Sequence, residues 1–136
     1  MLAVLMAGLL AQDAAPRSDL RREAPVLMSE ATTLIIDRSG DLAETLGRCA
    51  SVYPGGSANP FVVRARNEVA DLGIEDLTFA VRHVESVLFA QAAAEPRDPA
   101  RTVRACAAEI EEAAEDVRAY SVGLRALLVA LARLEQ

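Results

Sequence analysis

The chain has 136 residues, with 20 acidic side chains, 14 basic ones and a net charge of −6. This length suits one domain with a single core. The basic residues are all arginines and are interspersed among acids, so the chain lacks the basic surface of a nucleic-acid binder and the polybasic segment that anionic lipids attract. Aromatic residues make up 4% of the chain and alanine is abundant, which predicts an all-α fold, a small antiparallel helical bundle.

The first feature along the chain is an unbroken apolar run over residues 2–11. It is shorter than the roughly 20 residues of a bilayer-spanning helix, and it fits the roughly 7–15 residues of a signal-peptide core. No basic residue precedes it, and the small residues near a cleavage point fit the small-x-small rule poorly. We interpret residues 1–15 as a candidate signal peptide before a single helical-bundle domain over 19–136. A retained core helix is the alternative, and a membrane anchor is less favoured.

Three long helical blocks follow, separated by two proline-containing joints. The first block covers about residues 25–53. At each joint a residue suited to helix capping stands directly before a proline, as Asn59 before Pro60 and Asp98 before Pro99. Their side chains can accept hydrogen bonds from free helix N–H groups, and proline fits the first helical position. We therefore predict helix starts at Pro60 and Pro99.

Two glycines decide how many helices these blocks form. Gly40 lies inside the first block, which is one helix or two with a kink at this glycine. In the middle block, over about residues 60–94, Gly73 is typical of a left-handed residue that ends a helix, and the acidic Glu75 and Asp76 suit the start of the next one. The apolar positions roughly keep one phase across Gly73, so an unbroken helix is the alternative. We favour a break and hence four helices.

The third block has the most regular apolar stripe, stepping by three and four residues over about nine helical turns. Glutamates on its other faces are interpreted as a solvated surface rather than a cation site. The leucine-rich end of the stripe can pack inside the chain or against a second copy. The candidate interface residues are Leu124, Leu127, Leu128, Leu131 and Leu134.

Whether the two cysteines, Cys49 and Cys106, form a disulfide depends on the helix topology and on the cellular compartment. In a three-helix bundle they would lie roughly 25 Å apart at a rise of about 1.5 Å per residue, whereas a disulfide joins Cα atoms about 4.4–6.8 Å apart. A chain reversal at Gly73 brings both to one end. Export favours the disulfide, and two unpaired core thiols are the alternative. A redox-active pair is disfavoured, because the C-x-x-C spacing and a flanking cationic pocket are both missing.

The sequence offers little support for catalysis. The single histidine, His83, flanks an apolar stripe and is interpreted as a partly exposed residue on a helix face. The residues that follow it do not match the pattern of histidine phosphotransfer domains. There is no Glu-x-x-His pair, haem motif, glycine-rich phosphate loop or nucleophile elbow. We therefore predict no enzyme activity, no cofactor and no metal.

These observations predict a small exported protein of the bacterial periplasm or envelope, or a secreted one, with a non-catalytic binding or structural role. Its partner would be an unknown protein or a second copy of the chain. Nucleic acid and an integral membrane span are not expected in the mature protein. The alternative is a cytoplasmic bundle that acts by self-association or by phosphotransfer through His83.

Overall fold

The computed structural model describes residues 17–135, and this part of the chain contains four α-helices, one short 3₁₀ helix and no strand. The all-α bundle is therefore confirmed, and the candidate signal peptide over residues 1–15 lies outside the described residues. The elements are α2 (Arg17–Cys49), η1 (Gly56–Ala58), α3 (Pro60–Asp71), α4 (Glu75–Ala93) and α5 (Val103–Leu134).

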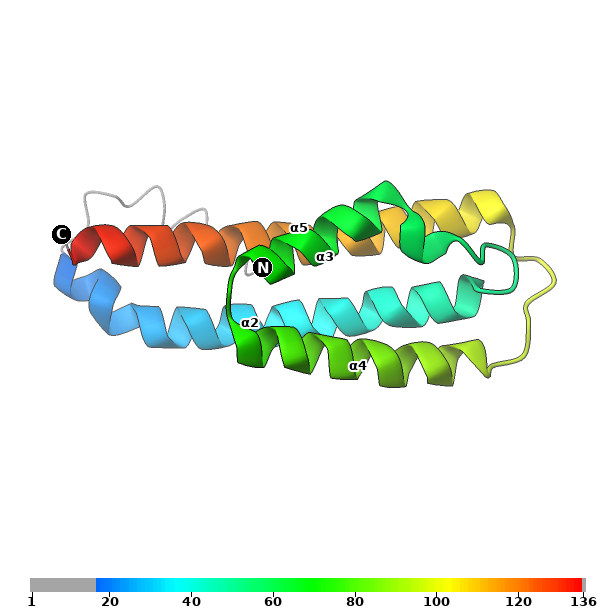
Figure 1. Ribbon diagram of the computed structural model, residues 1–136, viewed down its shortest axis with the longest axis horizontal. Coiled ribbons are helices and arrows are strands. Elements are labelled where there is room, and N and C mark those ends of the chain that lie inside the picture. Colours follow the sequence, from blue (N-terminus) through cyan, green and yellow to red (C-terminus); the bar gives the residue numbers. More distant parts are fainter. Residues whose placement is uncertain (1–16, 136) are drawn as a thin grey trace.

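The four helices form an up-down-up-down bundle in which consecutive helices are antiparallel (Figure 1). α2 packs against both α4 and α5, and α3 packs mainly against α5. α3 and α4 make little direct contact with each other. Going round the bundle, the order is α4, α2, α5 and α3. Three sides are closed by direct helix packing, and the fourth side, between α3 and α4, is open.

The first helix is longer and more continuous than the sequence predicted. It begins at Arg17 and contains Pro25, so the expected start at Pro25 was wrong. A proline removes one backbone hydrogen bond and bends a helix rather than always ending it, and α2 changes direction near its N-terminal end (Figure 1). Gly40 produces no break. A Cβ atom there would lie 2.7 Å from Leu88 Cδ1, so this glycine allows α4 to approach α2.

Gly73 ends α3 as predicted. Its φ is +68°, in the left-handed region that glycine adopts without a side-chain clash. The Gly73 N–H donates to the carbonyl oxygen of Ala70 at 3.1 Å, which satisfies one of the last carbonyls of α3. The chain then reverses and α4 begins at Glu75. The break and the four-helix topology are thus confirmed.

The two proline joints have different outcomes. α3 begins at Pro60, and Asn59 Oδ1 accepts from the Phe61 N–H at 2.9 Å, as expected. The predicted start at Pro99 was wrong, because Asp98 Oδ1 accepts instead from the Ala100 N–H within a turn. α5 begins at Val103, where Thr102 Oγ1 accepts from the Ala105 N–H at 3.1 Å. Asp98 and Thr102 are both suitable capping residues, and α5 starts after the second of them.

The core runs along the contact between α2 and α5 and extends onto α3 and α4. Its largest fully buried apolar side chains come mainly from α2 and α5, and they are Ile35, Leu42, Ile110, Leu124, Leu127 and Val62. Much of the apolar stripe predicted along the third block thus packs inside the chain, whereas Val103 at its start is exposed. Within residues 17–135, no helix combines the length and the apolar character needed to cross a bilayer.

Candidate functional site

Cys49 and Cys106 form a disulfide that ties the last residue of α2 to the first turn of α5. Their Cα atoms are 5.8 Å apart, and both residues are fully buried. Because the chain reverses at Gly73, the two cysteines lie at the same end of the bundle. The predicted bridge and its link to the four-helix topology are both present.

A guanidinium group lies against this disulfide. Arg101 Nη1 is 3.4 Å from Cys49 Sγ, 4.0 Å from Cys106 Sγ and 2.7 Å from Glu109 Oε2. The sequence predicted no cationic pocket beside the cysteines, and the structure places one guanidinium there, paired with Glu109. This contact follows from the later start of α5. Arg101 precedes α5 instead of lying within it, so its side chain can fold back over the sulfur atoms.

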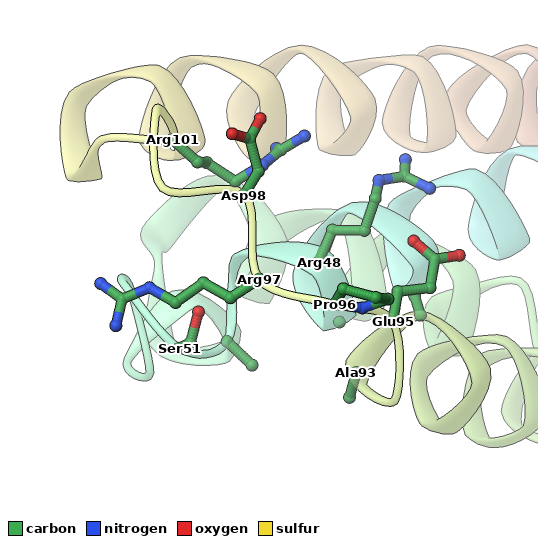
Figure 2. Close-up of a pocket in the computed structure, with 11 residues that line it drawn as sticks. Arg48, Ser51, Ala93, Glu95, Pro96, Arg97, Asp98 and Arg101 are labelled. Atoms are coloured by element: carbon green, nitrogen blue, oxygen red, sulfur yellow. The ribbon is translucent and has the colours of Figure 1, made fainter.

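A recess of about 230 Å³ lies beside the disulfide, between the ends of α2 and α4 and the loop that leads to α5 (Figure 2). Its charged lining residues are Arg48, Glu95, Arg97, Asp98 and Arg101. The three guanidinium groups point in different directions, and that of Arg97 points away from the other two (Figure 2). They do not converge on one point, so this recess does not form a binding site for a single anion.

The open side of the bundle contains a second recess, which we call the α3–α4 groove. Its volume is about 310 Å³, and it contains residues from all four helices. The apolar lining consists of four side chains that are at most 5% exposed, Leu42 from α2, Val69 from α3, Val81 from α4 and Val117 from α5, and of the exposed Ala70 from α3. A mostly apolar concave surface with a few polar groups is typical of small-molecule sites.

The polar groups of the α3–α4 groove come from different helices. Arg66 of α3 and Glu85 of α4 form an ion pair across it, with Nη2 and Oε2 3.2 Å apart. Burial raises the pKa of Glu85, and the nearby Arg66 and Arg82 partly oppose this rise. Ser39 of α2 also lines the groove, is 1% exposed, and has an Oγ atom without a hydrogen-bond partner.

Sequence reasoning missed this groove. Ser39 lies in phase with the buried Ile35 and Leu42 of α2, so a serine within an apolar stripe was the one available signal. The ion pair between Arg66 and Glu85 joins two helices that pack on different neighbours. No local spacing in the sequence connects these two residues.

The other predicted residues lie at several places. Leu124 and Leu127 are fully buried within the chain, so they are not available to a second copy, whereas Leu128, Leu131 and Leu134 are partly buried. His83 is exposed on α4 and lines neither recess. In residues 17–135, no group of three or more His, Cys, Asp or Glu residues is arranged to hold a metal ion.

No protein-family model, curated protein or solved structure matches this chain. Its functional assignment therefore rests on the disulfide and on the two recesses.

Proposed function

We propose that the protein is an exported helical bundle with a non-catalytic binding role, working in the periplasm or outside the cell. The observation that carries this proposal is the Cys49–Cys106 disulfide. Disulfides persist in oxidising compartments, whereas the cytosol keeps thiols reduced. The apolar run over residues 2–11, with the length of a signal-peptide core, supports the same location.

The position of the disulfide supports a structural use of the bond. It closes a chain segment with a sequence separation of 57 residues, and closing a loop of that length stabilises a fold by about 4 kcal/mol in the chain-entropy model. Both cysteines are fully buried, so a dithiol reductant has poor access to their sulfur atoms. The bond thus acts as a clamp between α2 and α5.

A binding role is favoured over a catalytic one by the contents of the recesses. The α3–α4 groove offers an apolar lining, one free hydroxyl and an ion pair. Its hydroxyl comes from Ser39, and His83, the residue best suited to act as its base, lies elsewhere on the exposed face of α4. Nucleophilic catalysis needs a base within hydrogen-bond reach of the nucleophile, whereas binding needs only the concave surface.

The test is the intact mass of the protein taken from its native organism, with an alkylating reagent added before the cells are broken. We expect no alkyl group on either cysteine, two alkyl groups after reduction, and a mass lacking about the first 11 to 15 residues, as for a processed signal peptide. Free thiols in the unreduced sample, or a chain that keeps Met1, would contradict export and favour the cytoplasmic alternative.

A further inference from the structure

We propose that the α3–α4 groove binds a small amphiphilic monoanion, a monocarboxylate with a short or medium-length apolar chain. This inference specifies the binding role proposed above and rests on that role, but it does not depend on where in the cell the protein works. The α3–α4 groove has a volume of about 310 Å³, near the lower end for ligand sites, so the occupant is a small molecule.

The groove follows from how the bundle is built. α2 packs against both α4 and α5 and so forms a wall and a floor with them, and α3 is held on α5. α3 and α4 make little direct contact, and the buried side chains of Val69 and Val81, which belong to the core, border the recess between these helices. A ligand with an apolar body would supply the packing that the missing helix contact leaves out.

Ser39 is the strongest sign of a missing partner. A serine or threonine inside a helix commonly donates to the carbonyl oxygen four residues earlier, and in this protein Ser121 does so to Val117 at 2.8 Å and Thr45 does so to Asp41 at 2.9 Å. Ser39 is as deeply buried as Ser121, yet its Oγ has no partner. A buried hydroxyl without a hydrogen bond is unfavourable. A polar atom of a ligand in the groove would satisfy it.

The charges at the groove favour a negatively charged ligand. Arg66 is paired with Glu85 at 3.2 Å, and Arg82 also lines the groove. Among residues 17–135, no carboxylate lies within ion-pair distance of the Arg82 guanidinium. Two guanidinium groups and one carboxylate leave one positive charge to be balanced. A carboxylate matches the planar fork of a guanidinium group, so a monocarboxylate fits both the charge and the geometry.

The experiment is a titration of the purified, oxidised protein with octanoate, octan-1-ol and octylamine, followed by NMR of the methyl groups. We expect saturable shifts at Leu42, Val69, Val81 and Val117 with octanoate. Because the Arg82 guanidinium is exposed, solvent screens a charge-assisted contact with it, so octan-1-ol should bind about threefold more weakly and octylamine more weakly still. Equal binding of all three, shifts that do not saturate, or shifts centred elsewhere would overturn the proposal.

Three variants locate the contacts. Arg82→Gln, at an exposed position, should weaken octanoate binding about threefold and leave octan-1-ol binding unchanged. Ser39→Ala should weaken both ligands several-fold without lowering the thermal midpoint of the free protein, because its hydroxyl makes no bond. Ser121→Ala is the matched control, since it removes a hydroxyl that is already bonded; it should leave the affinity unchanged.

If Ser39→Ala and Arg82→Gln both bind octanoate as the unmodified chain does, the groove is not the site. This outcome is independent of the thiol and mass measurement that tests export. A protein that is oxidised and processed but does not bind octanoate retains the proposed location and loses the proposed ligand.

Discussion

The α2–α5 side and the α3–α4 side of the bundle differ in how closely their helices pack. Along the α2–α5 side, apolar stripes meet directly, Leu124 and Leu127 are fully buried, and a disulfide joins the helix ends. On the α3–α4 side, an ion pair crosses a groove and a serine hydroxyl is left without a partner. Buried polar atoms without a hydrogen-bond partner occur on both sides, since Arg38 Nε of α2 and Arg118 Nε of α5 also lack one. The open side differs because its unpaired hydroxyl borders a recess, where the proposed ligand would reach it.

The largest expected effect comes from removing the disulfide between α2 and α5. The double variant Cys49→Ala/Cys106→Ala should lose about 4 kcal/mol of unfolding free energy, because the unfolded chain regains the entropy of the closed loop. Urea denaturation followed by circular dichroism measures this loss. Reduction of the unmodified chain is the control and should produce a similar loss. A change below about 1 kcal/mol would show that the disulfide does not act as a clamp.

Leucine truncations on the two sides sharpen the comparison. Leu124→Ala, in the packed α2–α5 contact, should cost about 3 kcal/mol because it leaves a cavity. Leu42→Ala removes an equally buried side chain that already borders the groove. Because the space that it leaves opens into the groove, its truncation should cost about 1 kcal/mol less. Equal losses in urea denaturation would mean that the groove is as tightly packed as the core.

Two glycines separate a close helix contact from a backbone requirement: Gly47 lies at the α2–α4 contact, and Gly73 lies in the turn between α3 and α4. Gly47→Ala should cost about 2 kcal/mol through overpacking, because its Cβ would lie 2.6 Å from the Phe89 carbonyl oxygen. Gly73→Ala should cost about 1 kcal/mol through its left-handed backbone alone, since no atom lies within 4 Å of the added Cβ. Gly55→Ala is the control and should be nearly neutral, because its added Cβ meets no atom within 4 Å and its φ of −83° suits alanine. Thermal unfolding would rank the three variants.

The smallest effect concerns the pH dependence of the open side. Burial raises the pKa of Glu85 above its ordinary value of 4.5. The folded state therefore holds the Glu85 proton more tightly than the unfolded state, so this group stabilises the fold at low pH and loses that contribution as pH rises from about 4.5 through the raised pKa. In urea denaturation across pH 4 to 8, the unfolding free energy of Glu85→Gln should fall less with rising pH than that of the unmodified chain. The same pH dependence in both proteins would contradict the raised pKa of Glu85.

The comparison also separates what the sequence predicts from what it does not. The α2–α5 contact and the chain reversal follow from local patterns: the stripe along α5, the left-handed glycine at position 73 and two cysteines that the reversal brings to one end. The groove depends on which helices pack on which. That order is set by tertiary contacts, such as the approach of α4 to α2 over Gly40 and Gly47.

The misassigned start of α5 shows the same limit on a smaller scale. Asp98 and Thr102 are both suitable capping residues, and the sequence alone does not rank them. The choice of Thr102 frees Arg101 to contact the disulfide. A difference of a few residues in a helix boundary thus changed the electrostatic environment of the cysteines.

The most direct test of the contrast between open and closed sides is a xenon titration of the oxidised protein, followed through its methyl groups by NMR. Xenon enters apolar recesses that are already present. The account predicts the largest saturable shifts at Val69, Val81 and Val117 and small shifts at Leu124 and Leu127. Shifts of equal size at both sets of residues, or the largest shifts at the two leucines, would contradict it.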